Sequence, residues 1–513
     1  NAFLSKKLVT LKTDLIEDIN LDEFKYPKVN PILKVADKLI DLDITNIIDK
    51  VKKDGLYIKT KIPKITFNAI LIENEKELFE IVEKIEDNIV AFDTETDSLE
   101  NPKIVGFSFA FEKDRAYYVP INHSYLGVEN QIDEKVALKA IKKILFKKVI
   151  GHNLKFDFKM LRNYEITTPT PFSDTMILAW ILDPDSSVGL DSVAKRYLNY
   201  TPIKFKEITG KNRSFAQVDI KDATKYACED AIITLKLYEI LSKKIWDEVK
   251  WDLENIEMPF INLLIDMEKE GIKLDIEYME ELKEKITKKL ESLTKEIYSL
   301  AGVEFNIKST KQLSHILFEV LKLPAKKKTK TGYSTDEKVL NSLKNSHPII
   351  KKLIEFRKYE KLLSTYIIPL LEYAKKDKEH KIYTNFLQTG TATGRLSSKN
   401  PNLQNIPTDK EINIRNAFIA TKEFVSLDYS QIELRLLAHF SKDSHLVKAF
   451  FEDKDIHLET AKKLFGENAK EFRHIAKSIN FGLIYGMGAK KLSETINVST
   501  KEAKEFIEKY FAS

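Results

Sequence analysis

The first residues that could do chemistry are two carboxylates at the end of an apolar segment. Residues 91–95 read AFDTE, and because side chains alternate along a strand, Asp93 and Glu95 project from the same side. Carboxylates at this spacing repel each other unless a cation neutralises them, and such hard oxygen ligands select Mg²⁺ or Mn²⁺. The pair alone is a weak signal, because chance occurrences are common and a solvated strand end explains it better, so a metal site depends on further ligands.

Two later segments add one carboxylate each at helical spacing. Asn153 and Asp157 are four residues apart in GHNLKFDFKML, and Tyr226 and Asp230 repeat that spacing in KYACEDAIITLKLY, so each pair is predicted to share one helix face. An isolated Asp near a helix is normally solvated or a cap, whereas four acids on one strand and two helices together favour a site for divalent cations. Zinc is not indicated, because none of the nine histidines shows ligand spacing.

A second group of candidates lies in the C-terminal part. In FVSLDYSQIELR, residues 424–435, an apolar strand is predicted to deliver Asp428 and a helix to begin at about Gln431, so Asp428 is either a metal ligand or a cap. In RHIAKSINFGLIYG, two cations and two aromatic residues recur every four positions along one ridge of a helix: Arg473, Lys477, Phe481 and Tyr485. This ridge suits a triphosphate followed by a base and sugar, whereas a salt-bridged amphipathic helix is the alternative.

Two polar loops suit contacts to a nucleic acid. Residues 391–407, TATGRLSSKNPNLQNIP, combine loop formers with uncharged hydrogen-bonding side chains and one arginine. Such groups favour sugar-phosphate and minor-groove contacts that do not read sequence. Residues 324–334, PAKKKTKTGYS, form a basic loop whose lysines either clamp phosphates in a salt-dependent manner or are simply solvated.

The elements that must position these residues follow from hydrophobic patterning. β-branched and aromatic runs predict strands at 65–71, 89–93, 104–111 and 116–120, and a helix is predicted at 135–145, which together indicate an α/β module. From about residue 250 the chain is predicted to be largely helical. One apolar stripe there indicates bundle packing: Leu282, Ile286, Leu290, Leu293, Ile297 and Leu300.

Bulk properties limit the class of protein. A length of 513 residues predicts two to four domains. No apolar twenty-residue stretch occurs, so no membrane partner is expected, and a single cysteine, Cys228, excludes an internal disulfide and favours the cytoplasm. The net charge of +5 neither demands nor excludes nucleic acid, because binding depends on where the charges cluster.

The acidic segments resemble the DEDDy exonuclease motifs of the family A DNA polymerases, the bacterial DNA polymerase I type. The intervening strings SDTMILAWILDPD, LDSVAKRYL and FKEITGK fit the same family. The resemblance implies that Asp93, Glu95, Asp157 and Asp230 hold two divalent ions, Mg²⁺ or Mn²⁺, and that Tyr226 orients the attacking water. It therefore implies a 3′→5′ exonuclease that acts in the cytoplasm, at the nucleoid.

FVSLDYSQIELR resembles the palm motif of the same family over twelve consecutive positions, and RHIAKSINFGLIYG resembles its fingers helix. The resemblance implies a polymerase site with two ions, in which Asp428 is a catalytic metal ligand assisted by the Tyr429 carbonyl and Glu433 excludes a ribose 2′-hydroxyl. The implied contacts to a deoxynucleoside triphosphate are His457, Arg473, Lys477, Phe481 and Tyr485. The implied contacts to primer-template DNA are Arg395, Asn402, Gln404, Asn405, Lys326, Lys327 and Lys328.

The resemblance also implies the fold class and the domain order. The chain is expected to be multidomain α/β and α+β, with an RNase H-like 3′→5′ exonuclease domain followed by a helical thumb, a partial palm and partial fingers of a right-hand polymerase. The expected boundaries are 1–62 for a remnant or linker like the tail of a 5′-nuclease segment, 63–248 for the exonuclease, 249–380 for the connection and thumb, 381–455 for the palm and 456–513 for the fingers.

The resemblance is incomplete at both ends. The N-terminal remnant lacks the acidic metal sites of a flap nuclease, so no such activity is expected. Family members also carry a second palm carboxylate in a His-Asp-Glu motif, and no HDE string occurs in this sequence. We expect either that a C-terminal segment or second chain completes the palm, or that the sequence is cut from a longer one. The alternatives are a stand-alone 3′→5′ exonuclease with a residual primer-template-binding region, and a non-catalytic primer-template clamp.

Overall fold

The computed structural model describes residues 65–512, apart from gaps at 87, 99–101, 170–172, 211–213, 326, 330–331, 410 and 497, together with Val35 and Leu39. The predicted N-terminal remnant, those two positions apart, and Lys326 therefore lie outside the described residues. Two compact units make up the chain, one ending at Thr421 and the other running from Lys422 to Ser513. Among the described residues, no helix is long and apolar enough to cross a membrane.

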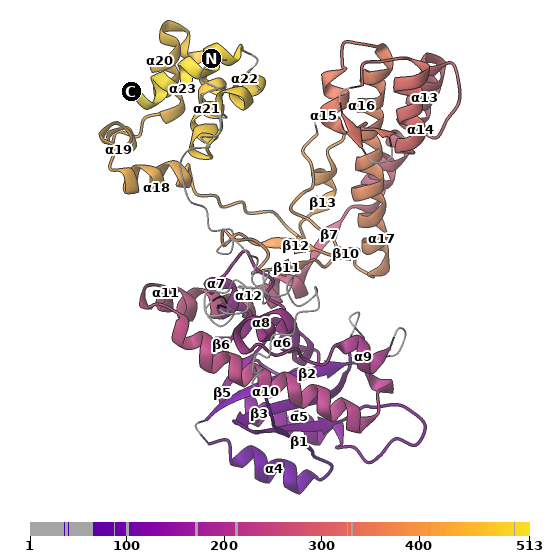
Figure 1. Ribbon diagram of the computed structural model, residues 1–513, viewed down its shortest axis with the longest axis vertical. Helices are drawn as coiled ribbons and strands as arrows, with labels where there is room; N and C mark the ends of the chain where they lie inside the picture. The colour runs from indigo at the N-terminus through magenta and orange to yellow at the C-terminus, as the bar shows by residue number, and fades with distance from the viewer. Residues whose placement is uncertain are drawn as a thin grey trace, which may run out of the picture. The chain divides into compact units, whose positions relative to one another are not determined.

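A mixed six-stranded sheet organises the first part of unit 1, with the strand order β1-β4-β3-β2-β5-β6 (Figure 1). Only β3 runs antiparallel to its neighbours. The strands are β1 Asn68–Leu71, β2 Ile89–Thr96, β3 Ile104–Glu112, β4 Arg115–Pro120, β5 Lys148–Gly151 and β6 Ser173–Asp174. The four strands predicted from the sequence correspond to β1 to β4, and β2 continues past Asp93 to Thr96.

Helices cover this sheet and set the positions of polar groups at its edge. The 25-residue helix α10 packs along β1 to β5, and Asp219 caps its N-terminus by accepting from the Lys221 N–H (Figure 1). The helices are α4 Glu75–Glu83, α5 Glu134–Leu145, α6 Leu154–Arg162, α7 Thr175–Leu182, α8 Leu190–Leu198, α9 Phe205–Thr209, η3 Phe215–Gln217 and α10 Ile220–Lys244. The predicted helix at 135–145 is α5.

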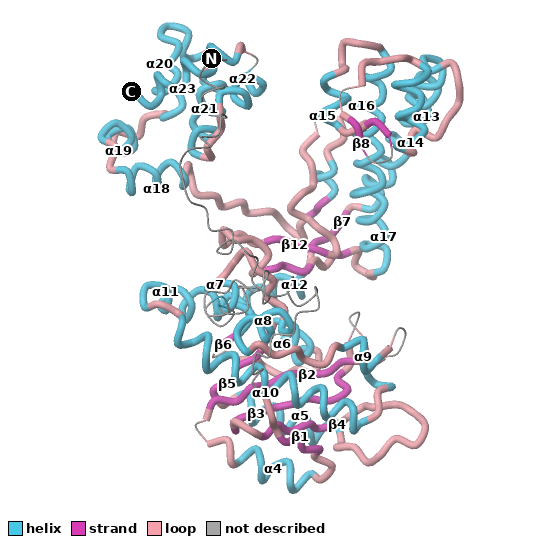
Figure 2. Tube along the Cα trace, in the orientation of Figure 1, coloured by secondary structure: helices cyan, strands magenta, loops and turns pink. Residues whose placement is uncertain are grey.

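A helical region follows within unit 1 (Figure 2). Its helices are α11 Asp247–Asp252, η4 Leu253–Glu257, α12 Met258–Glu270, α13 Ile276–Ala301, α14 Thr310–His315, η5 Ile316–Val320, α15 Glu337–Ser342, α16 Pro348–Lys361, η6 Leu362–Ile367, α17 Ile368–Lys376 and η7 Ile414–Ala417. The predicted apolar stripe lies on α13, which packs against α16. Its members are buried except Leu300, which is half-buried, and Ala301 is buried beside it.

Short strands interrupt the helices of unit 1. Strand β7 lies between β10 and β13 in a three-stranded antiparallel sheet, and two hairpins pair β11 with β12 and β8 with β9. The strands are β7 Ile272–Leu274, β8 Lys328–Thr329, β9 Gly332–Tyr333, β10 Lys381–Ile382, β11 Asn385–Leu387, β12 Ser397–Lys399 and β13 Phe418–Ile419. The β11–β12 hairpin presents residues 388–396 as a loop, which includes the start of the polar segment 391–407.

Unit 2 is helical wherever it has regular structure. Its helices are α18 Ile432–Ser441, α19 Ser444–Phe451, α20 Ile456–Phe465, η8 Gly466–Lys470, α21 Arg473–Ile484, α22 Ala489–Ile496 and α23 Thr500–Ala512. The strand predicted to deliver Asp428 is wrong for this structure, because residues 423–429 have no regular structure and Leu427 is 91% exposed. A strand needs a paired neighbour, and no described strand pairs with this segment.

The buried face of α13 gives a direct test of this packing. Ile286 is fully buried, so Ile286→Ala removes apolar contacts and leaves a cavity, and we expect a loss of about 2–4 kcal/mol in the free energy of unfolding of this region. Denaturant unfolding measures the loss. The exposed Lys295→Ala on the same helix is the control and should change stability by less than about 0.5 kcal/mol. Equal effects of the two variants would contradict the packing.

Candidate active sites

Three carboxylates gather where β2 meets α10. Oxygen atoms of Asp93, Glu95 and Asp230 lie within 4.8 Å of one another. Glu95 is only 7% exposed, and its Oε1 is buried without a hydrogen-bond partner. A buried carboxylate oxygen with no donor is unfavourable unless a cation neutralises it. The group therefore fits a divalent cation with oxygen ligands.

Helix α10 supplies Asp230 together with a tyrosine one turn earlier. The Tyr226 hydroxyl donates a hydrogen bond to Asp230, as expected for residues four apart on one face. The aromatic rings of Phe205 and Phe215 lie 6.2 and 6.0 Å from the ring of Tyr226 and hold it in place. Burial and then the charge of Asp230 raise the pKa of Tyr226, so its hydroxyl stays protonated and can act as a donor.

Asp157 borders this cluster but contacts a different part of β2. One oxygen of its carboxylate accepts from the backbone N–H of Thr94 at 3.0 Å and from the Thr94 hydroxyl at 2.6 Å. Asp157 nevertheless lies close enough to raise the pKa of both Asp93 and Glu95. The predicted helix face shared with Asn153 is wrong, because Asn153 has a φ of 73° and precedes the first residue of α6.

Two buried acids hold the surrounding elements and were not among the predicted site residues. Asp174 accepts from the backbone N–H groups of Asn153 and Leu154 at 3.1 and 2.8 Å, which fixes the start of α6. Glu229 accepts from the Tyr200 hydroxyl and the Ile203 N–H, both at 2.6 Å. The sequence signal for Asp174 is its place immediately before the helical run TMILAWIL, whereas Glu229 has no local signal beyond its adjacency to Asp230.

Burial dominates the electrostatics of the carboxylate cluster. It is the largest cause of the raised pKa of Asp93 and Glu95, and the neighbouring carboxylates add to it. Burial likewise raises the pKa of Asp157 to about 7, although the hydrogen bonds from Thr94 oppose it, and that of Asp230 to about 8, although the bond from Tyr226 opposes it. Bound cations would reverse these shifts, because they favour the charged form.

The ridge predicted in unit 2 lies on α21. Arg473 and Lys477 are exposed on that helix, Phe481 is half-buried, and Tyr485 is the helix C-cap. Arg473 pairs with Asp455 at 2.6 Å. The Tyr485 hydroxyl donates to Glu433 on α18 at 2.5 Å. The structure therefore brings two of the predicted nucleotide-binding residues, Glu433 and Tyr485, into direct contact.

The other predicted residues of unit 2 have different surroundings. His457 is only 3% exposed, bonds Asn480 at 3.0 Å, and packs its ring 5.5 Å from that of Phe481. It therefore supports the ridge from inside and does not lie on its exposed side. Asp428 and Tyr429 are both exposed, and among the described residues Asp428 belongs to no cluster of three potential metal ligands.

The predicted DNA-contacting residues lie on two loops of unit 1. Asn402 accepts from the backbone N–H groups of Gln404 and Asn405, both at 3.1 Å, and the Gln404 side chain donates to the Leu396 carbonyl at 2.8 Å. These bonds hold the loop in one conformation and leave the side chain of Arg395 exposed. In the other loop, Lys327 is paired with Asp336 at 3.0 Å and Lys328 is exposed on β8.

Comparison with known families separates the chain into two matching regions. Residues 69–246 match the family model described as 3′-5′ exonuclease, and residues 276–513 match the model described as DNA polymerase family A. The chain is similar to DNA polymerase I of Borreliella burgdorferi, at 40% identity over 100% of this chain and 60% of that protein. It is similar to DNA polymerase I of Helicobacter pylori at 38% identity, over 100% and 58% respectively.

The chain thus spans about 60% of the length of these curated relatives. Among solved structures, it resembles the POL domain of Pol1 from M. smegmatis in complex with DNA primer-template and dNTP. The TM-score is 0.72 at 29% identity, covering 86% of this chain and 76% of that one. The predicted fold class, multidomain α/β and α+β with exonuclease and polymerase regions, is confirmed.

The raised pKa values make a prediction about stability without metal. An unfolded aspartate has a pKa near 3.9, against about 8 for Asp230 in the folded protein, so the folded state binds more protons between these values. Stability of the metal-free protein should therefore fall as the pH rises from about 4 to 8. We expect Asp230→Asn to raise the free energy of unfolding at pH 8 in chelator by on the order of 2 kcal/mol.

Denaturant unfolding in EDTA at pH 5 and pH 8 measures this effect, which should be much smaller at pH 5. Asp222→Asn is the matched control, because Asp222 lies exposed on the same helix and pairs with Lys225. Added Mg²⁺ should stabilise the native protein more than Asp230→Asn. A variant less stable than the native protein at pH 8 in EDTA would contradict the raised pKa.

Proposed function

We propose that this chain, which matches the family models described as DNA polymerase family A and 3′-5′ exonuclease, acts in template-directed DNA synthesis with proofreading. The proposed substrates are primer-template DNA and deoxynucleoside triphosphates, and we assign the action of the protein to the nucleoid in the cytoplasm. The observation that carries the proposal is the cluster of Asp93, Glu95 and Asp230, together with the contact between Glu433 and Tyr485.

The proposed exonuclease removes nucleotides from the 3′ end of the primer. Asp93, Glu95 and Asp230 hold divalent ions, and Asp157 completes the set from the side of Thr94. When bound, the ions activate the attacking water and stabilise the leaving 3′ oxygen. The Tyr226 hydroxyl, which remains protonated, orients that water beside Asp230.

We assign Mg²⁺ or Mn²⁺ to the site, with two ions per active site. The ligands are carboxylate oxygens, which these hard cations prefer, and the group contains no histidine or cysteine. The unpartnered Glu95 Oε1 supports the assignment, because it is an acceptor that no described protein donor satisfies.

The proposed polymerase reaction joins a nucleotide to the primer. The primer 3′-hydroxyl attacks the α-phosphate, and pyrophosphate leaves. Asp428 would hold a catalytic ion together with the Tyr429 carbonyl, and Arg473 and Lys477 would bind the triphosphate as exposed cations on α21.

Specificity for a deoxyribose is assigned to the contact on α18. Glu433 blocks a ribose 2′-hydroxyl and is held by the hydroxyl of Tyr485, which frames the base pair together with Phe481. His457 supports Phe481 from inside the unit.

Primer-template DNA is assigned to the polar loop after β11 and to the basic loop of the thumb. The proposed DNA contacts are Arg395, Asn402, Gln404, Asn405, Lys327 and Lys328. The proposed domains are the exonuclease at 63–248, the connection and thumb at 249–380, the palm at 381–455 and the fingers at 456–513. Exposed lysines on such a loop suit phosphates, whose contacts weaken as salt rises.

The exonuclease assignment predicts loss of primer shortening in Asp93→Ala/Glu95→Ala. Removing two ion ligands should lower the rate by more than about a hundredfold. A 5′-labelled primer on a longer template, incubated with Mg²⁺ and no deoxynucleotides, measures shortening. Glu112→Gln, an acid on the neighbouring strand outside the cluster, is the control and should retain the native rate. Shortening that survives in the double variant would contradict the assignment.

The polymerase assignment predicts that Asp428→Ala abolishes primer extension by the assembled polymerase that contains this chain, because an ion ligand is lost. Primer degradation should continue, since the carboxylate cluster lies in the other unit. The same labelled primer, assayed with and without deoxynucleotides, separates the two activities. Glu494→Gln, an exposed acid of unit 2, serves as the control. Loss of both activities would count against separate sites.

A further inference from the structure

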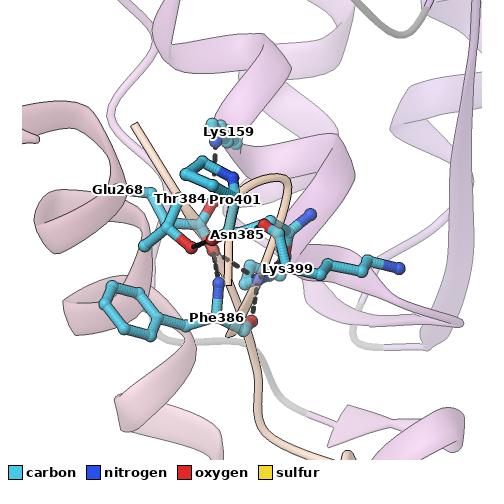
Figure 3. Close-up of polar contacts among 8 residues, drawn as sticks. Lys159, Glu268, Thr384, Asn385, Phe386, Lys399 and Pro401 are labelled. Carbon is cyan, nitrogen blue, oxygen red and sulfur yellow. Dashed lines mark hydrogen bonds and ion pairs between the residues drawn. The ribbon is translucent and has the colours of Figure 1, made fainter. Parts of the chain in front are cut away.

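A buried carboxylate joins the helix of the exonuclease site to the hairpin that presents the polar loop (Figure 3). Glu268 of α12 has a completely buried side chain. Its carboxylate accepts from the Nζ atoms of Lys155 and Lys159 at 2.5 and 2.6 Å, and from the Phe386 N–H of β11 at 2.9 Å. One acid therefore contacts α6 and β11 at the same time.

Lys155 of α6 joins the same two elements, α12 and β11. Its ammonium donates to Glu268, to the Asn385 side-chain oxygen at 2.8 Å and to the Phe386 carbonyl. An ammonium group has three protons, so all three of its donors are used. Lys155 is 13% exposed, and burial lowers its pKa while Glu268 opposes that shift. The charged groups are thus fully satisfied by partners on three separate elements.

A second tether holds the loop farther along. The indole N–H of Trp180, on α7, donates to the Thr391 carbonyl at 2.9 Å, and the Thr391 hydroxyl donates to the Arg395 carbonyl at 2.8 Å. The first tether joins α6 and α12 to the β11–β12 hairpin, and the second joins α7 to the same hairpin. The Glu268 tether contacts β11, the strand before the loop, and the Trp180 tether contacts the loop itself.

Helix α6 contacts both α12 and the carboxylate cluster. Lys155 and Lys159 are four residues apart and face α12, while Asp157 between them faces Thr94 and the carboxylate cluster. Burying an ion pair costs desolvation energy, and well-packed apolar residues are often at least as stabilising. Polar groups that reach α6, α12 and β11 together instead fix their relative geometry, because each hydrogen bond requires a particular direction.

We propose that Glu268 is a positioning residue that sets the place of the β11–β12 loop relative to the exonuclease carboxylates. This inference rests on the proposed function, in which that loop contacts primer-template DNA. The substrate it serves is a 3′ end still attached to a duplex, because the duplex is held by the loop while the end must reach the carboxylates. A free single strand needs only the carboxylate cluster and does not depend on the loop.

The experiment compares two substrates on Glu268→Gln, which keeps the side-chain volume and removes the charge. One substrate is a 5′-labelled single-stranded oligonucleotide, and the other is a primer-template with a mismatched 3′ terminus, both with Mg²⁺. We expect kcat/KM on the primer-template to fall at least tenfold and kcat/KM on the single strand to stay within twofold. Equal losses on both substrates, or no loss on either, would overturn the proposal.

Asp266→Asn is the matched control, because Asp266 pairs with Arg162 across the same two helices without reaching the hairpin. Its ratio of the two activities should equal that of the native protein. Trp180→Phe keeps an aromatic ring and removes the second tether, so it should shift the ratio in the same direction as Glu268→Gln. If Glu268→Gln does not fold, an unchanged ratio in Trp180→Phe overturns the proposal by itself. A native chain that degrades neither substrate would instead refute the proposed exonuclease.

Discussion

The burial of several carboxylates beside one another is the constraint on which the exonuclease domain depends. Asp93 and Glu95 lie on the same side of β2, and α10 brings Asp230 against them. The raised pKa of these carboxylates means that their charged forms are unfavourable in the folded protein, and the rest of the domain must offset that cost. The offset comes from a central sheet whose β2 and β3 are mostly buried and from the capped helices α6 and α10. The free energy gained by packing the core of this domain therefore offsets the cost of burying the carboxylates at the edge of the sheet.

The charged groups of the two proposed sites differ in how far they are exposed to solvent. In unit 1 the acids of the cluster are buried, and divalent cations are the ligands proposed for them. In unit 2 the cations of α21 are exposed. Beside them the buried His457 and Asn480 bond to each other, and Asn480 also accepts from the Thr460 hydroxyl of α20. A small metal ion suits an enclosed set of oxygens, whereas a flexible triphosphate suits a solvated row of cations. The exposure of each set of residues thus corresponds to the size and charge of the ligand assigned to it.

The sequence predicted those features that arise from local pattern. Strands β1 to β4 and the stripe on α13 follow from periodicity. Spacing paired Asp93 with Glu95 and Tyr226 with Asp230, and the family resemblance assigned the two pairs to one site. Contacts between distant residues could not be predicted, because no local pattern encodes them: Lys155 and Glu268 are separated by 113 positions. The prediction of a strand before Asp428 was wrong for the same reason. Apolar residues indicate a tendency to form a strand, but they do not indicate whether a neighbouring strand is there to pair with it. Asn153 shows a smaller error, in which helical spacing did not reveal that α6 begins one residue later.

The double use of α6 restricts how this helix can change during evolution. Asp157 faces the carboxylate cluster, while Lys155, Lys159 and Arg162 face α12. One inserted or deleted residue would rotate everything after it by about 100° and shift it by 1.5 Å along the axis. Either the acid or the basic face would then lose its partners. Length variation should therefore be confined to the connections on either side of the helix, and α6 itself can diverge only by substitution.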